Sequence, residues 1–158
     1  MARKHSFLLR TDGKGCFFYI CIRMQNSGFQ FPKQEKLSSR KEIDRLFKEG
    51  QSFLAYPFRV QFQLDREADD VPVRALFSVP KRRFRRAVLR NRLKRRMREA
   101  YRLNKPGLID VFHYRRVSLR VAFIFVGKDE LDYFVIEKGM KKALERLKKE
   151  VEQVGKKE

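Results

Sequence analysis

The side chains best suited to chemistry in this chain lie in one stretch, residues 81–102, and the chemistry they suit is anion binding. The stretch has 22 residues, of which twelve are Lys or Arg and one, Glu99, is acidic, so it carries +11 of the formal net charge of +20. Guanidinium and ammonium groups at this density bind phosphates. The stretch therefore predicts a surface for a polyanion, with a merely solvated basic face as the alternative.

Helical spacing from about Arg86 separates this stretch into two faces. One face is apolar and reads as a helix docked on a core: Leu89, Leu93, Met97, Ala100 and Tyr101. The other is cationic: Asn91, Lys94, Arg95, Arg98 and Arg102, with Arg90 and Arg92 on its flanks. Like charges four residues apart cost an isolated helix about 0.2 to 0.5 kcal/mol per pair. A partner that neutralises them, such as a phosphate backbone, explains the pattern better than solubility does.

Residues for protein-based catalysis are scarce. Cys16 and Cys21 are the only cysteines, and His5 and His113 are the only histidines. Their spacing matches no zinc site and no disulfide framework, so a reducing cytoplasm is the expected location. No nucleophile–base set and no Gly-rich phosphate loop appears. We therefore predict no catalytic residue and no metal ligand in this chain.

Composition favours one globular domain that binds nucleic acid. The chain has 158 residues, 42% of them hydrophobic, and a pI near 10.5. No apolar run approaches the roughly 20 residues of a membrane-spanning helix. Residues 1–31 lack periodicity, although the apolar run 16–22 raises the alternative of a signal peptide; we expect a poorly ordered extension, with Met24 as an alternative initiator. The domain should cover 32–154, and 155–158 should form a tail.

Periodicity predicts the elements that position the basic helix. Ser38 or Ser39 can cap a first helix, with Glu42 completing a capping box and Gly50 ending it. Its expected buried stripe is Ile43, Leu46 and Phe47. Alternating residues in 53–64 and 71–79 predict two strands, and the acidic stretch 65–70 between them a solvated loop.

After the basic helix, residues 108–116 read either as a helical turn or as a connector. Residues 119–126 predict a central strand, and Asp129 or Asp132 caps a last helix that runs to about Val151. Its core stripe is Ile136, Met140, Leu144, Leu147 and Val151. The order predicts a compact α/β sandwich whose sheet is covered by helices on one face and partly open on the other.

The sequence VPKRRFRRAVLRNRLKRRMREAYR, residues 79–102, resembles the signature of the protein subunit of bacterial ribonuclease P. The matching positions are Lys81 and Arg82, Ala87, the Arg90-Asn91-Arg92 triplet, Lys94-Arg95 and Arg98-Glu99. The resemblance extends over about residues 37–147 and leaves 1–31 outside.

The resemblance implies an αβββαβα, two-layer α+β sandwich like domain 2 of ribosomal protein S5, with a left-handed crossover around the basic helix. It also implies a function: one copy of the protein joins one catalytic RNA, and together they remove the 5′ leader of precursor tRNA. The RNA would perform the hydrolysis with Mg²⁺. Alternatives from other classes are a structural, ribosomal-type RNA-binding protein and a nuclease that acts alone.

The resemblance assigns two surfaces. The RNA-binding surface is Lys81, Arg82, Arg86, Arg90, Asn91, Arg92, Lys94, Arg95 and Arg98. The Asn91 side chain could instead form a local hydrogen bond within the helix, or help to hold a hydrated metal ion. The leader cleft, between the first helix and the open sheet face, is Ile43, Phe47, Phe58 and Gln61. Phe47 and Phe58 could equally be core aromatics, and Ile43 and Gln61 stand where relatives often have aromatics, so we expect weaker leader stacking here.

Overall fold

Four strands form one mixed sheet in the order β1-β2-β4-β3. The computed structural model describes residues 31–65 and 69–154. β1 (Gln51–Ala55) and β2 (Phe58–Asp65) form an antiparallel hairpin, β2 pairs antiparallel with β4 (Ser118–Phe125), and β3 (Val73–Ser78) runs parallel to β4. The predicted single strand 53–64 is thus two strands, because Tyr56 and a cis Pro57 turn the chain in the middle of the apolar run.

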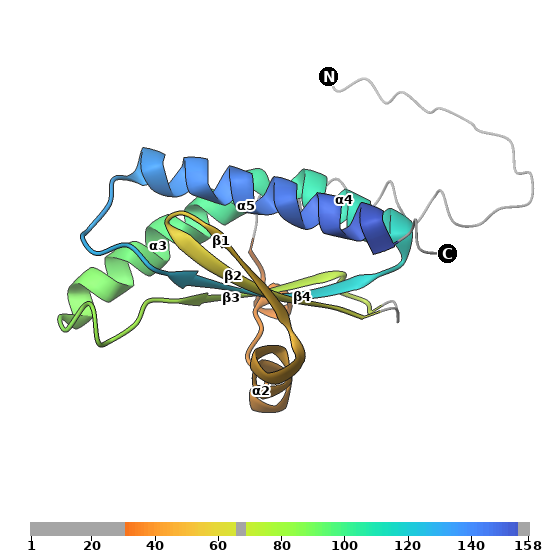
Figure 1. The fold of residues 1–158 in the computed structure, drawn as a ribbon, viewed down its shortest axis with the longest axis horizontal. Coiled ribbons are helices and arrows are strands. Elements are labelled where there is room, and N and C mark those ends of the chain that lie inside the picture. Colours follow the sequence, from red (N-terminus) through yellow and green to blue (C-terminus); the bar gives the residue numbers. More distant parts are fainter. Residues whose placement is uncertain (1–30, 66–68, 155–158) are drawn as a thin grey trace, which may run out of the picture.

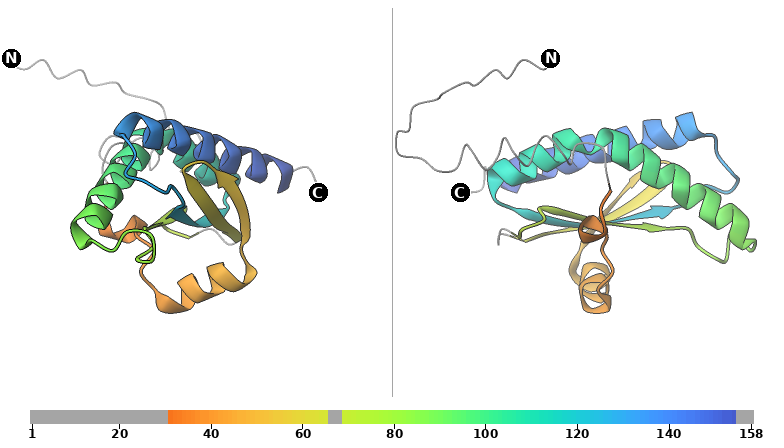
Figure 2. Two further views of the ribbon diagram at one scale, coloured as in Figure 1. Left: turned by 60° about the vertical axis from the view of Figure 1, so that its left-hand side comes forward. Right: turned by 180° about the vertical axis from the view of Figure 1, so that it is seen from behind.

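The helices lie unequally on the two faces of the sheet. α3 (Ala87–Asn104), α4 (Pro106–Arg115) and α5 (Tyr133–Val154) cover one face, and α2 (Arg40–Glu49) is the one α-helix of the described residues that crosses the other face (Figures 1 and 2). A short 3-10 helix, η1 (Lys33–Glu35), precedes α2. The expectation of one covered and one partly open face is confirmed. Residues 108–115, left undecided above, belong to α4, and Arg116 is its C-cap. One more helix therefore stands between the basic helix and the central strand than the αβββαβα order has.

The large core lies between the sheet and the three helices. β4 is buried along most of its length. The ring of Phe123 on β4 stacks on the ring of Phe77 on the neighbouring β3, with ring centroids 5.5 Å apart. The predicted apolar faces of α3 and α5 are buried, except that Leu89 is half-buried and the side chain of Val151 lies outside the described residues. Burial of apolar surface such as these faces is the dominant favourable contribution to folding.

The segment before α2 is tied to this core. The ring of Phe31 lies 5.6 Å from the rings of both Phe77 and Tyr101, so Phe31, which we expected in the extension, packs on the core. Lys36 bridges to Ala75 beside β3, and the amide of Leu37 donates to the Ala75 carbonyl. The predicted extension before Phe31 and the tail 155–158 lie outside the described residues.

α2 is held by a second, smaller apolar cluster. Leu46 of α2 packs with Leu37 and Ala122, with Ile43 half-buried beside them. Ser39 is the N-cap, but its side chain makes no capping bond, and Glu42 pairs with Arg74 and Arg120 instead of completing the predicted capping box.

Gly50 ends α2 as predicted. A β-carbon at this position would lie 2.3 Å from the Leu46 carbonyl oxygen, so no larger residue fits without a shift of the backbone. The chain can therefore turn directly from α2 into β1.

Candidate nucleic-acid interface

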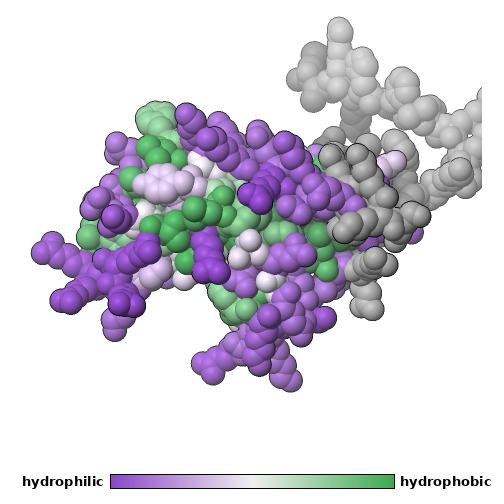
Figure 3. Space-filling view, viewed as in Figure 1, coloured by the Kyte–Doolittle hydropathy of each residue, from purple (hydrophilic) through white to green (hydrophobic). Residues whose placement is uncertain are grey.

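α3 presents its cationic side outward because its apolar side is anchored in the core. Leu93, Met97, Ala100 and Tyr101 are buried, and Phe84, just before the helix, packs edge-to-face on Phe125. Arg83 also donates to the Val126 carbonyl, which fixes the chain before the helix. Hydrophilic side chains project from this end of the molecule in the space-filling view (Figure 3).

Most of the predicted RNA-binding side chains have no partner within the described part of the protein. These side chains make neither a hydrogen bond nor an ion pair with another described residue: Lys81, Arg82, Arg86, Asn91, Lys94, Arg95 and Arg98. All are exposed except Lys94, which is half-buried. An uncompensated cationic surface of this kind is suited to neutralising phosphates.

The other two predicted residues of this surface have partners in the protein. The Arg90 Nη1 donates to the Phe84 carbonyl at 2.8 Å and the Arg85 carbonyl at 2.7 Å, so Arg90 braces the loop before α3. Arg92 lies 3.2 Å from a carboxylate oxygen of Glu130. Arg90 is therefore positioned to shape the surface, while Arg92 is exposed but already paired.

The acidic residue of the basic stretch is also paired. Glu99 lies 2.6 Å from Arg102, and this hydrogen bond lowers the pKa of Glu99 below its ordinary value of 4.5. The pairing is between residues three apart on one helix, where oppositely charged side chains meet. Arg102 is thus partly neutralised, and the free cationic surface lies toward the start of α3.

The four residues predicted for the leader cleft do not lie together. Phe47 is 44% exposed and Ile43 half-buried, both on α2, so Phe47 does not belong to the buried stripe predicted for that helix. Gln61 lies beneath α2, where its amide donates to the carbonyls of Leu46 and Phe47 at 3.0 and 3.2 Å. Phe58 is a correction: it is 0% exposed on the opposite face, packed against Phe123 and Phe125, and is a core aromatic.

The strand register reveals a row of residues that the sequence analysis missed. Leu54 pairs with Arg59, Arg59 with Ile124, and Ile124 with Ser78, so the four lie in one row across the sheet on the α2 side. Leu54 is 66% exposed and Arg59 is exposed. Arg59 alternates with buried Phe58 and Val60, a signal that could have placed it on the open face. The row ends at Ser78, three residues before Lys81.

At the other end of the sheet, carboxylates neutralise two arginines. Arg120 pairs with Asp65, Glu42 and Asp69, and Arg74 pairs with Glu42 at 3.0 Å. The predicted solvated role of the acidic stretch 65–70 therefore does not hold for Asp65 and Asp69. This charge cluster joins α2 to the sheet.

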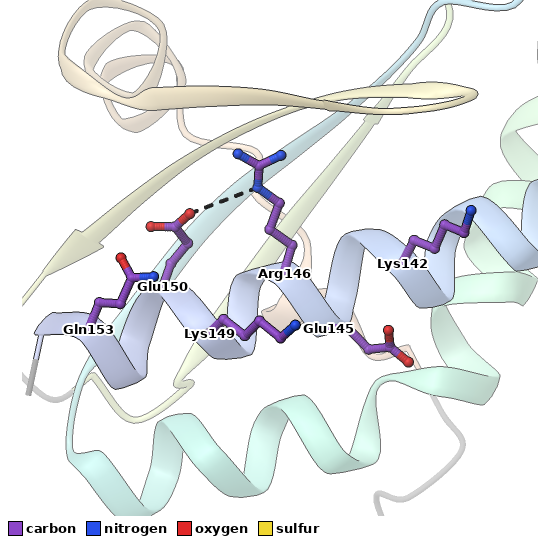
Figure 4. Close-up of a pocket in the computed structure, with 6 residues that line it drawn as sticks. All are labelled: Lys142, Glu145, Arg146, Lys149, Glu150 and Gln153. Carbon is purple, nitrogen blue, oxygen red and sulfur yellow. Dashed lines mark ion pairs between the residues drawn. The ribbon is translucent and has the colours of Figure 1, made fainter.

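Two further features do not form a site. Among residues 31–65 and 69–154, no group of three His, Cys, Asp or Glu side chains could hold a metal ion. A hollow on α5 is lined by six side chains of that single helix, which point in different directions (Figure 4). Its Arg146 lies 3.9 Å from Glu150 and over the ring of Phe53 at 4.4 Å, so its charge is already partnered.

No helix in the described part is long and apolar enough to cross a membrane.

Comparison with known proteins points to one family. The family model described as Ribonuclease P matches residues 31–148. The ribonuclease P protein component of Porphyromonas gingivalis is 44% identical over 119 residues, covering 75% of this chain and 87% of that protein. The protein component of Thermotoga maritima is 30% identical over 120 residues, covering 74% and 95%.

Solved structures give the same result for the fold. The RNase P protein of Staphylococcus aureus superimposes with a TM-score of 0.58 at 22% identity, covering 72% of this chain and 94% of that one. The RNase P protein of Thermotoga maritima superimposes with a TM-score of 0.56 at 26% identity, covering 70% and 96%. The predicted α+β architecture and the resemblance read from residues 79–102 are both confirmed. This chain belongs to the ribonuclease P protein family and is a protein component of that ribonucleoprotein.

Proposed function

We propose that the chain binds the ribonuclease P RNA through the outward side of α3 and assists that RNA in removing the 5′ leader of precursor tRNA. The observation that carries this proposal is the set of seven RNA-binding side chains that have no partner in the described part of the protein. RNA is recognised largely through its phosphates, 2′-hydroxyls and shape, which such a surface can contact. One protein is expected to bind one RNA, in the cytoplasm.

The cleavage itself is assigned to the RNA, which would use Mg²⁺ to hydrolyse the phosphodiester and leave a 5′-phosphate on the tRNA. Mg²⁺ usually keeps several water ligands and binds phosphate oxygens, so we place the ion on the RNA and not in a dedicated protein site. The contribution of the chain is electrostatic: it neutralises phosphates that otherwise repel one another, and it should thereby lower the Mg²⁺ concentration that cleavage requires.

The leader would lie along the uncovered row of Leu54, Arg59, Ile124 and Ser78, beside Phe47. Single-stranded nucleic acid is bound by exposed aromatic side chains together with cationic groups along the backbone. The row offers the exposed Arg59, and α2 offers the exposed Phe47, whose carbonyl accepts a hydrogen bond from Gln61, two residues from Arg59 on β2. Replacing Phe47 by Ala should weaken binding of precursor tRNA by about 1 to 3 kcal/mol and leave mature tRNA unaffected. Tyr114→Ala is the matched control, because Tyr114 is 85% exposed on α4, outside this row.

The test of the whole proposal is reconstitution with ribonuclease P RNA at low Mg²⁺, with release of the 5′ leader measured. The parent protein should stimulate release. A double variant, Arg95→Gln with Arg98→Gln, should bind the RNA more weakly and lower the slope of log affinity against log salt by about two. Lys142→Gln with Lys149→Gln on α5 is the charge-matched control. Binding without stimulation would favour a purely structural RNA-binding role, and cleavage by the protein alone would favour a nuclease.

A further inference from the structure

We propose that Arg92 and Arg96 form a phosphate-binding site for RNA, and that the carboxylate of Glu130 occupies this site in the free protein and must leave when RNA binds. Arg96 was not among the predicted RNA-binding residues, and Glu130 lies in the loop between β4 and α5. This inference rests on the proposed binding of ribonuclease P RNA and deepens it.

The geometry is that of two guanidinium groups holding one anion. Arg92 and Arg96 are four residues apart on α3, so their side chains share one side of the helix. The same oxygen of Glu130 lies 3.2 Å from Arg92 Nη1 and 3.0 Å from Arg96 Nη1. A phosphate oxygen accepts the same hydrogen bonds from guanidinium groups as a carboxylate oxygen does. Glu130 therefore stands where a phosphate of the RNA could bind.

The site would persist without its carboxylate, because Arg96 has a second anchor. Arg96 Nη1 also donates to the backbone carbonyl of Leu131 at 2.8 Å. The Arg96 guanidinium thus stays beside the loop when Glu130 moves away, while Arg92, with a side chain 54% exposed, is free to reach an incoming phosphate. The ion pairs are partly exposed, and such pairs are weak, so a phosphate can displace the carboxylate at little cost.

The charge around the site favours an RNA phosphate as the occupant. Arg95 and Lys94 of the same helix lie next to the pair in sequence and have no partner among the described residues. A polyanion that binds Arg95 and Arg98 places further phosphates along the helix, and one of these phosphates then competes with the Glu130 carboxylate for the guanidinium groups of Arg92 and Arg96. Glu130 acts as an internal competitor that weakens RNA binding.

The test is a double-mutant cycle on affinity for ribonuclease P RNA at low salt. Glu130→Gln should tighten binding by about 2- to 5-fold, the range expected for removing a competing exposed ion pair. In the Arg92→Gln background, Glu130→Gln should give a clearly smaller gain, because the competitor then has only one guanidinium left to hold. Glu145→Gln on α5 removes the same charge from a described residue that forms no ion pair with Arg92 or Arg96, and it should change affinity less than Glu130→Gln. Thermal melting of each variant checks that it is folded.

Two outcomes overturn the inference. Unchanged or weaker binding by Glu130→Gln would make Glu130 a brace that organises Arg92 and Arg96. An equal gain in the parent and Arg92→Gln backgrounds, or from Glu145→Gln, would reduce the effect to net charge. In either case, binding of the parent protein to the RNA would leave the proposed function standing, whereas failure of the parent to bind would remove that function itself.

Discussion

Replacing Lys105 should destabilise this protein more than replacing any surface cation. The Lys105 ammonium, at the junction of α3 and α4, is 0% exposed and lies 2.6 and 2.8 Å from the two carboxylate oxygens of Glu35, whose side chain is 10% exposed. Lys105→Met keeps the apolar length of the side chain but leaves the Glu35 carboxylate buried without this cation. Removing one member of a buried pair costs about 3 to 5 kcal/mol, a large fraction of a typical folding stability.

The double variant Lys105→Met with Glu35→Gln should recover most of that loss, since the buried charge is then gone as well. Urea unfolding followed by circular dichroism measures both effects. Lys141→Met is the control, because Lys141 pairs with Glu137 in an exposed i,i+4 arrangement worth only about 0.3 to 0.5 kcal/mol. A loss below about 1 kcal/mol for Lys105→Met, or a double variant as unstable as the sum of the single ones, would refute the reasoning.

The loss should also depend on pH in a defined direction. Burial raises the pKa of Glu35 above its ordinary value of 4.5, although the hydrogen bond and charge of Lys105 act against this. In Lys105→Met these opposing effects are absent, so the pKa rises further. A carboxyl group whose pKa is raised in the folded state stabilises the fold fully at a pH below its unfolded-state pKa, and this stabilisation is lost as the pH rises through the folded-state pKa. The Lys105→Met deficit should therefore be large at neutral pH and shrink as the pH falls toward 4.5.

Three further predictions concern other contacts. Gly139→Ala should lower stability by about 1 to 3 kcal/mol in a thermal melt, because its β-carbon would lie 2.4 Å from Pro57 Cδ and 2.6 Å from the Tyr56 carbonyl oxygen. Gly107→Ala, whose β-carbon would approach only the mobile end of Lys148, is the control and should cost less. Gln61→Leu should cost about 1 to 3 kcal/mol in urea unfolding by removing both bonds to α2, and an unchanged midpoint would contradict that role. In an NMR titration, Arg102→Gln should return the lowered pKa of Glu99 toward 4.5. The stability that the Glu99–Arg102 pair supplies is present at a pH above 4.5 and is lost as the pH falls below that value.

Periodicity predicted the helices and strands that carry an apolar face, because burial of that face determines their structure. The stripes of α3 and α5 were read correctly from residue spacing alone, apart from the half-buried Leu89. Periodicity missed the turn at Tyr56-Pro57, because hydrophobic residues continue through it. Pro57 is a local signal for that turn, which the reading of alternation alone passed over. Periodicity also left α4 undecided, because that helix lacks a clear apolar stripe.

Residue spacing predicted part of the candidate site but not the contacts that residues distant in the sequence make there. The cationic face of α3 follows from helical spacing, but the partners of Arg90 and Arg92 come from backbone carbonyls and from Glu130, which lies 38 residues after Arg92. Phe58 and Gln61 were placed in one cleft, although alternating strand residues at odd separation face opposite sides of a sheet. The alternation along residues 53–64 therefore separates them, and the contacts of Gln61 with α2 and of Phe58 with Phe123 and Phe125 identify the two faces.

The lone position of α2 has a consequence for how the molecule moves. Three helices share the large core, whereas α2 is held by three buried apolar residues, the two bonds from Gln61 and the ion pairs of Glu42. Elements with few buried apolar contacts open at lower free energy than the rest of a domain. Amide hydrogens of α2 should therefore exchange with solvent faster than those of α3 and α5, and added salt should speed that exchange by screening Glu42 from its arginines. The position of the exposed Phe47 relative to the sheet would then vary with ionic strength, whereas α3 is anchored in the large core.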